Sequence, residues 1–272
     1  MRRLAVLGSP IAHSKSPALH RAAYRQLGLD WEYSAIEMRG EGLRTFIEGL
    51  DDTWRGLSLT MPLKQDVLPL LDDRDELAEL TGAANTVLFD AGTRRGFNTD
   101  VGGIVRTLGD AGITELRDGI VIGGGATAAS ALVAMAELGA ARVRVLVRRP
   151  GAASALLVLG RRLGVDVEEG RIEDLGRARE AELVVSTVPG GTELGLVASD
   201  TLIRSGALLD VAYDPWPSPL AAAWIAVGGT VVHGFGMLLH QALLQVRIFV
   251  NGDPLAPLPD EDAVLAVMRG TL

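Results

Sequence analysis

Short apolar runs alternate with longer amphipathic segments along almost the whole chain. In the first hundred residues, the runs that predict strands lie at 4–7, 31–37, 57–59, 86–89 and 94–97. The last two flank Asp90-Ala-Gly-Thr, which is typical of a hairpin turn. Amphipathic spacing predicts helices from Ser16, over 43–50 and over 99–111.

A second series of strand-like runs begins after Asp118-Gly119, at 120–122, 143–147, 166–168, 183–186, 207–211 and 230–232. Helical patterns fill the gaps, and the chain ends in helices expected at 235–250 and 261–269. Strands that alternate with helices are typical of βαβ units and parallel sheets, so the predicted class is α/β. The pattern favours two α/β domains that join near residue 100.

Glycines follow the first strand of the second series, where Gly123-Gly-Gly125-Ala-Thr-Ala128 precedes an Ala-rich helix. In such a Gly-x-Gly-x-x-Ala turn, the first glycine permits the bend and the second lets the backbone approach a pyrophosphate. The amides of the helix start then face the phosphates. We therefore predict a Rossmann-like dinucleotide site at Gly123, Gly124, Gly125 and Ala126. The alternative is a glycine-rich turn that binds nothing.

The next strand indicates which dinucleotide would bind. A site for NAD usually places a carboxylate about 20 residues after the glycines, whereas a site for NADP uses arginine. Residues 138–165 contain no Asp or Glu, and the strand ends in Arg148 and Arg149. Guanidinium groups pair well with phosphate, so we predict NADP. The alternative for these two arginines is a solvated charge run.

Arginine supplies almost all the positive charge, and Lys15 and Lys64 are the only lysines among 26 basic residues. A lysine amine can act as a proton donor, whereas an arginine guanidinium cannot lose its proton in a protein. Lys64 follows a short apolar strand and a proline turn, which is a common position for a functional side chain. Lys64 is therefore a catalytic candidate, whereas Lys15 is read as an exposed bystander.

Charge and composition exclude several classes of function. The net charge of −8 argues against a nucleic-acid-binding surface. The chain has no cysteine, and its first apolar run ends at Gly8, too early for a signal peptide. Its four histidines show no metal-binding spacing, and no apolar run approaches the length of a membrane span. We expect a cytoplasmic protein without a metal; a homodimer is one alternative for its assembly.

Two serines lie at the expected start of the first helix. Ser16 followed by Pro17 is typical of an N-cap and first helical residue. Together with Ser14 and the free amides of the helix start, it could hold a small carboxylate. The alternative is a plain helix cap.

Taken together, these segments resemble the shikimate dehydrogenase family. The matching segments follow one another along nearly the whole chain, at Gly8–Pro17, Thr60–Lys64, Gly82–Thr86, Gly96–Asp100, Gly123–Ala128, Asp210–Tyr213 and Gly234–Gln241. The resemblance implies NADPH-dependent, reversible reduction of 3-dehydroshikimate to shikimate in aromatic amino-acid biosynthesis. It also implies a substrate domain of residues 1–100, completed by the C-terminal helices in 236–272, and a Rossmann-like NADP domain of residues 101–235.

The resemblance assigns roles to particular residues. Lys64 and Asp100 would form the catalytic pair. The implied substrate-binding residues are Ser14, Ser16, Thr60, Asn85, Tyr213 and Gln241. The implied cofactor-binding residues are Gly123, Gly124, Gly125, Ala126, Arg148, Arg149, Gly234 and Met237. Reduction of a ketone by hydride leaves an alkoxide that needs a proton, and the Lys64 amine can supply it.

This chain departs from the family pattern in one place near the site. The family usually has Asn-Val-Thr before the proline turn, and here the segment is Ser58-Leu-Thr60. Any contact that this Asn makes to a substrate hydroxyl is therefore not expected from Ser58. Two other functions stay open: a dehydrogenase of quinate or an aminated shikimate analogue, and an inactive dinucleotide-binding regulator. The presence of Lys64 and Asp100 argues against the regulator.

Overall fold

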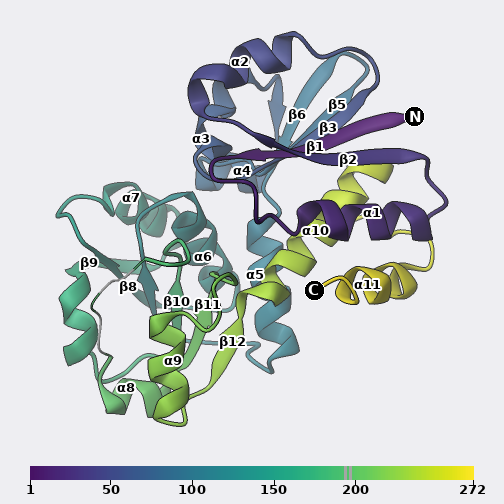
Figure 1. Ribbon diagram of the computed structural model, residues 1–272. Coiled ribbons are helices and arrows are strands. Elements are labelled where there is room, and N and C mark those ends of the chain that lie inside the picture. The colour runs from purple at the N-terminus through teal and green to yellow at the C-terminus, as the bar shows by residue number, and fades with distance from the viewer. Residues whose placement is uncertain (193–194, 196–197) are drawn as a thin grey trace. The chain divides into compact units, whose positions relative to one another are not determined.

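The computed structural model describes residues 1–192, 195 and 198–272. The chain forms two compact units, one of Met1–Gly103 with Leu238–Leu272 and the other of Ile104–Met237. Their boundaries fall within helices α5 (Asp100–Asp110) and α10 (Gly234–Asn251), which are labelled in Figure 1. In the described part of the chain each unit contains a six-stranded sheet covered by helices, which confirms the predicted α/β class.

The sheet of the first unit is mixed, with strand order β2-β1-β3-β5-β6-β4. Its strands are β1 (Arg2–Gly8), β2 (Trp31–Glu37), β3 (Trp54–Leu59), β4 (Asp73–Arg74), β5 (Thr86–Asp90) and β6 (Thr93–Phe97). Strand β1 is parallel to β2 and β3, whereas β5 is antiparallel to β3 and β6. The predicted hairpin is therefore present, joined by a turn at Ala91 and Gly92.

Two apolar cores cover the two faces of this sheet, because successive side chains of a strand point to opposite faces. Leu4 and Val6 of β1 belong to a core with α1 (Ser16–Gln26), α10 and α11 (Glu261–Arg269). Ala5 and Leu7 belong to the other core, which includes α2 (Gly40–Glu48) and α3 (Leu63–Asp66). Figure 1 shows α1 beside α11, and the two helices are in extensive contact. Short elements that the pattern did not predict are β4, α3, the 3₁₀ turn η1 (Leu68–Leu70) and α4 (Glu76–Thr81).

The sheet of the second unit is parallel, with order β12-β11-β10-β7-β8-β9. Its strands are β7 (Asp118–Ile122), β8 (Arg142–Val147), β9 (Asp166–Arg171), β10 (Leu183–Ser186), β11 (Ala207–Asp210) and β12 (Val231–His233). The strand order reverses between β7 and β10, as in a doubly wound Rossmann fold. Ligands of such sheets bind at the carboxyl ends of the strands at this reversal.

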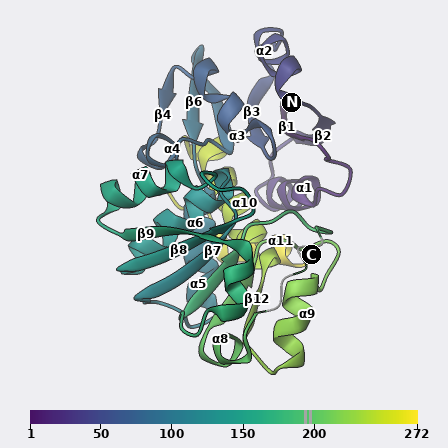
Figure 2. The ribbon, with the colours of Figure 1, turned by 90° about the vertical axis from the view of Figure 1, so that its left-hand side faces the viewer.

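Helices cover both faces of the second sheet (Figure 2). They are α6 (Ala126–Glu137), α7 (Ser154–Leu163), the 3₁₀ helix η2 (Ile172–Arg177), α8 (Asp200–Ser205) and α9 (Pro219–Ala226). Helices α8 and α9 pack with η2 on one face, around the buried Trp224. Small residues on α6, such as Ala128 and Ala131, are buried, which lets this helix approach the sheet closely.

Candidate active site

The first unit contains a buried ion pair between the two residues expected to be catalytic. Lys64 lies in the short helix α3, and Asp100 is the first residue of α5. Lys64 Nζ is 2.5 Å from Asp100 Oδ2, and the two side chains are only 13% and 5% exposed. A charge-assisted hydrogen bond of this kind orients the amine of Lys64.

Asn85 holds the other oxygen of the Asp100 carboxylate. Its Nδ2 donates to Asp100 Oδ1 at 2.7 Å, and its Oδ1 accepts from the backbone amide of Thr99 at 2.9 Å. Because that amide can only donate, it fixes which end of the Asn85 side chain faces Asp100. Both carboxylate oxygens of Asp100 therefore have a partner, one from Lys64 and one from Asn85.

Two further residues expected to bind substrate lie in the same unit. Gln241 of α10 is nearly buried, and its Oε1 lies 3.5 Å from Asn85 Nδ2. Thr60 follows β3, and its backbone amide donates to the carbonyl of Leu7 at the end of β1. A side chain at Gly8 would place its Cβ 2.2 Å from Thr60 Cγ2, so only glycine permits this approach. The fold thus brings Lys64, Asn85, Asp100 and Gln241 into one hydrogen-bonded group.

The prediction that Ser16 is the N-cap of α1 was wrong. Lys15 is the N-cap, and its carbonyl accepts from the amides of Ala18 and Leu19. Ser16 has already entered the helix, so its hydroxyl is not placed to cap the first turn. The Lys15 side chain forms no capping hydrogen bond at this helix start. Ser14 is half-buried and Ser16 is buried, and the Ser16 amide lies 3.4 Å from Ser14 Oγ.

The glycine turn of the second unit has the geometry of a phosphate-binding loop. Gly123 has a φ of +116°, and a Cβ there would lie 2.4 Å from Thr187 Oγ1. Gly125 is the N-cap of α6, and a Cβ on it would meet no heavy atom of the described residues within 4 Å. As a glycine, this N-cap has no side chain that could cap α6. The amides at the start of α6, beginning with Ala126, can therefore bind an anion, which fits the predicted dinucleotide.

Arg148 and Arg149 follow β8 and are exposed. Over residues 1–192, 195 and 198–272, neither guanidinium forms an ion pair within the chain. Glu169 of β9 organises the turn that carries them, since its carboxylate accepts from the amides of Gly151 at 2.6 Å and Ala153 at 3.0 Å. The two arginines are thus available to an anion from a turn with a fixed backbone.

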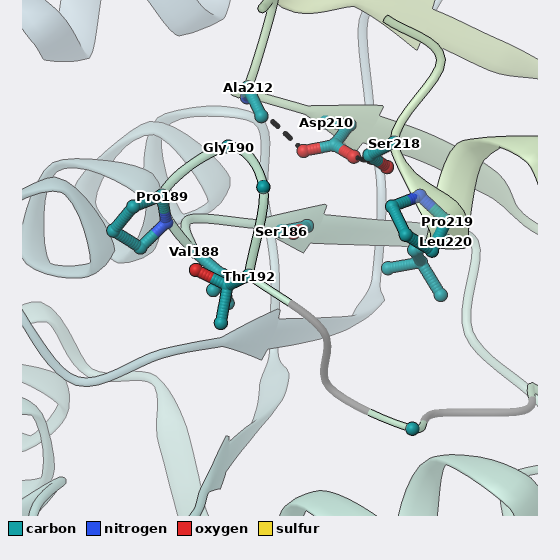
Figure 3. Close-up of a pocket in the computed structure, with 12 residues that line it drawn as sticks. Ser186, Val188, Pro189, Gly190, Thr192, Asp210, Ala212, Ser218, Pro219 and Leu220 are labelled. Atoms are coloured by element: carbon teal, nitrogen blue, oxygen red, sulfur yellow. Dashed lines mark hydrogen bonds between the residues drawn. The ribbon is translucent and has the colours of Figure 1, made fainter. Parts of the chain in front are cut away.

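The carboxyl ends of β10 and β11 line a cavity of about 260 Å³, shown in Figure 3. Asp210 and Ser218 point toward each other there, and the Ser218 hydroxyl and the Ala212 amide both donate to the Asp210 carboxylate. Burial raises the pKa of Asp210 above its usual range, while the Ser218 hydrogen bond opposes this. Ser186 of β10 lines this cavity, and β10 is one of the two strands between which the sheet reverses its order.

The remaining predicted residues also lie in the second unit. Tyr213 follows β11, and its ring centroid is 5.4 Å from that of Phe235. Burial raises the pKa of Tyr213, so its hydroxyl stays protonated. Gly234 begins α10, where a Cβ would lie 2.6 Å from the carbonyl of Val211, and Met237 is buried one turn later.

Comparison with known proteins decides the family. The model of the shikimate dehydrogenase substrate binding domain matches residues 6–87. The shikimate dehydrogenase (NADP(+)) of Methanothermobacter thermautotrophicus is 32% identical, with 97% of this chain and 96% of its own covered. The chain belongs to the shikimate dehydrogenase family. Its resemblance to that family, inferred from the spaced motifs, is therefore confirmed.

Solved structures of the family share the whole fold. The crystal structure of the Mycobacterium tuberculosis shikimate dehydrogenase has a TM-score of 0.86 and 39% identity, covering 99% of this chain and 100% of that one. A Thermus thermophilus shikimate 5-dehydrogenase in complex with NADP(H) and shikimate has a TM-score of 0.83 and 32% identity, and both chains are fully covered. The fold class with a substrate domain and a Rossmann-like NADP domain is thus confirmed.

Ser58, the departure from the family pattern, is turned to the protein interior. It is 3% exposed, accepts from the Tyr33 hydroxyl and donates to Gln245 Oε1, both at 2.7 Å. Sequence reasoning missed Gln245. The signal that could have revealed it was a second glutamine, one turn after Gln241, in a helix of mostly apolar residues.

The described residues contain no group of three or more His, Asp or Glu that could hold a metal ion. None of their helices is both long and apolar enough to cross a membrane.

Proposed function

We propose that this protein is an NADP-dependent shikimate dehydrogenase that interconverts shikimate and 3-dehydroshikimate in aromatic amino-acid biosynthesis. The observation that carries the proposal is the buried Lys64–Asp100 pair, held by Asn85 in a chain that belongs to this family. A proton donor fixed in this way is what the reduction of a ketone to a secondary alcohol requires.

Lys64 and Asp100 carry out the proton transfer of the reaction. In the reducing direction, the ammonium of Lys64 donates a proton to the carbonyl oxygen as negative charge develops on it. Asp100 orients the amine through the 2.5 Å hydrogen bond. It also accepts a hydrogen bond from the alcohol hydroxyl that this proton transfer forms. In the oxidising direction, Lys64 takes that proton back as the neutral amine.

The other polar residues bind the substrate in the proposal. Ser14 and Ser16, with the amides at the start of α1, hold the carboxylate of shikimate. Tyr213 of the second unit is a further substrate-binding residue. Thr60, Asn85 and Gln241 bind the ring hydroxyls. Polar side chains that are almost fully buried, such as Asn85 and Gln241, fit this role because a hydroxylated ring satisfies their remaining hydrogen-bonding capacity.

The second unit fits the cofactor. The glycines at 123–125 and the amide of Ala126 would hold the pyrophosphate, and Arg148 and Arg149 would hold the 2′-phosphate. Gly234 and Met237 would contact the nicotinamide end. When bound, NADPH supplies the hydride that the protein itself cannot provide.

The domain roles follow from these assignments. Residues 1–100 with 236–272 would form the substrate domain, and residues 101–235 the NADP domain. The match of the substrate binding domain to residues 6–87 supports this division. We take the enzyme to act in the cytoplasm and leave a homodimer as the alternative to a monomer. Cell fractionation and sedimentation of the purified protein would test these two points.

One experiment separates the proposal from its alternatives. Purified protein is offered shikimate or quinate, each with NADP or NAD, and reduced nicotinamide is followed by its absorbance. We expect saturable turnover with shikimate and NADP, and much weaker turnover with the other three combinations. A preference for quinate would make the protein the related dehydrogenase. Dinucleotide binding without turnover of either substrate would favour the regulator.

A further inference from the structure

Gln245 is a fully bonded amide buried beside the candidate active site. It lies on α10, one turn after Gln241, and is 2% exposed. A side-chain amide has an oxygen that accepts two hydrogen bonds and a nitrogen that donates two. Gln245 forms all four of these, so its position and orientation are fixed.

The oxygen of Gln245 accepts from two buried donors. Ser58 Oγ lies 2.7 Å from Gln245 Oε1, and His20 Nε2 lies 3.1 Å from it. Tyr24 lies 3.2 Å from the other ring nitrogen of His20 and can donate to it. With the proton of a neutral His20 on Nε2, each of these contacts has one donor and one acceptor. The side-chain nitrogen of Gln245 is thereby turned in the opposite direction.

That nitrogen binds the segment that carries Asn85. It donates to the backbone carbonyl of Asn85 at 3.2 Å and to the hydroxyl of Thr86 at 3.1 Å. The Thr86 hydroxyl in turn donates to Asn85 Oδ1 at 2.9 Å. Gln245 is therefore linked to both the backbone and the side chain of Asn85.

We propose that Gln245 is a positioning residue for the dehydrogenase reaction. Through the Thr86 hydroxyl and the Asn85 carbonyl, it adds to the Thr99 amide in holding the Asn85 side chain so that Nδ2 faces Asp100, which in turn orients Lys64. The inference rests on the proposed function, because it assigns Gln245 to the same site. The geometry links Gln245 to the catalytic pair through two side chains, Thr86 and Asn85, and the last link is the 2.7 Å hydrogen bond from Asn85 Nδ2 to Asp100 Oδ1.

The sheet register explains why this role falls to helix α10. Ser58 lies directly opposite Thr86 in the pairing of β3 with β5. An amide at position 58, where the family usually has Asn, would lie beside the segment of Asn85 and Thr86. Serine lacks that amide. Gln245 supplies one from α10, and its Oε1 accepts a hydrogen bond from the Ser58 hydroxyl. Ser58 and Gln245 thus act as a pair.

The first test compares Gln245→Leu with Leu243→Ala. Leu243 is a buried, purely apolar residue of the same helix, so its truncation destabilises the fold without removing a hydrogen bond. For Gln245→Leu we expect kcat with shikimate to fall about tenfold, the upper range for one neutral hydrogen bond, with the KM for NADP unchanged. Leu243→Ala should keep its turnover at temperatures where it is folded. Equal turnover in Gln245→Leu and the parent would overturn the proposal.

A second variant separates positioning from packing. Gln245→Ala should lose turnover, and adding Ser58→Asn to it should restore most of the loss, because an amide then returns beside Thr86. Failure of this rescue in a folded double variant would assign the effect to lost packing of α10 and contradict the proposal.

A readout without substrate keeps the inference separate from the proposed function. In ¹⁵N-labelled parent protein, the Asn85 side-chain amide should give one pair of sharp NMR signals, which should broaden or shift in Gln245→Leu but not in Leu243→Ala. Unchanged Asn85 signals in Gln245→Leu would overturn the positioning role whatever the substrate is. Absence of shikimate turnover in the parent would instead contradict the proposed function alone.

Discussion

Lys64 Nζ lies 2.5 Å from Asp100 Oδ2, although 36 residues separate the two in the chain. Both side chains are largely withdrawn from water, and Asn85 occupies the second carboxylate oxygen. Removing one member of a buried pair leaves the other charge uncompensated, which typically costs about 3–5 kcal/mol of stability. Variants at these positions therefore need a measurement of folding beside the measurement of turnover.

We predict that Ser14→Ala and Ser16→Ala weaken substrate binding and leave the chemical step almost unchanged. A contact to the shikimate carboxylate is present in the ground state and the transition state alike, so its loss raises KM with little effect on kcat. Because Ser16 is not the N-cap of α1 and the Ser14 hydroxyl makes only a long hydrogen bond of 3.4 Å to the Ser16 amide, the melting temperature should stay close to that of the parent. Steady-state kinetics and thermal unfolding check both points. A fall in kcat at unchanged KM would show that these serines do not bind the carboxylate.

Replacing Arg148 and Arg149 together by glutamine should weaken NADP binding by a few kcal/mol, since charge-assisted hydrogen bonds contribute roughly 1.5–3 kcal/mol each. Use of NAD should change little, because NAD has no 2′-phosphate for these exposed guanidinium groups to bind. Titration calorimetry with both cofactors at low and high salt measures the effect. Salt should weaken NADP binding more in the parent than in the variant.

The matched control for that pair is Arg161→Gln with Arg162→Gln, two arginines in the last turn of α7. The control has the same change in net charge but should retain its preference for NADP. If both double variants lose the same amount of NADP affinity, the effect comes from overall charge and the assignment to Arg148 and Arg149 is wrong.

His20 should make the stability of the protein depend on pH. Its burial lowers its pKa from 6.5 to about 3, a shift only partly opposed by the hydrogen bond to Gln245. Between these two values the unfolded chain binds more protons than the folded one, so stability falls as the pH drops, by up to about 1.4 kcal/mol per pH unit. The neighbouring Tyr24 and Tyr33 stay protonated here, because burial raises their pKa values.

The variant His20→Gln removes this titration and should show a smaller loss of stability on acidification. Urea unfolding of the parent and of His20→Gln, near pH 7 and near pH 5, measures the difference. Equal losses in the two proteins would show that His20 binds no extra proton on unfolding.

Much of the fold could be predicted from the sequence because its signals are local. Alternation of apolar runs and helical patterns depends on near neighbours, and it predicted the strands of the Rossmann sheet to within a few residues. The short elements α3, α4 and β4 could not be predicted in this way, because they contain too few residues to show a period. Ser16 was misassigned because a helix boundary shifts easily by one residue.

In the candidate site, the sequence predicted the residues that lie within motifs of the family and missed those outside them. Lys64, Asn85 and Asp100 each lie in a motif of the family, and the structure joins them by hydrogen bonds. Gln245 and Ser58 are hydrogen-bonded although 187 residues separate them in the chain. A contact between such distant residues cannot be predicted from the local sequence pattern. Glu169 likewise fixes the turn after β8 from the next strand, through backbone amides that carry no sequence signal.

The account is tested most directly by oxidation of shikimate with NADP, measured side by side for the parent, Lys64→Ala and Lys64→Arg. We predict saturable turnover by the parent and a fall of about 10²-fold or more in Lys64→Ala, in the range of general-acid contributions. Lys64→Arg should also be poor although it keeps the charge beside Asp100, because guanidinium does not release its proton. NADP should bind all three folded proteins alike. Turnover near the parent level in either variant, or none in the parent, would contradict the account.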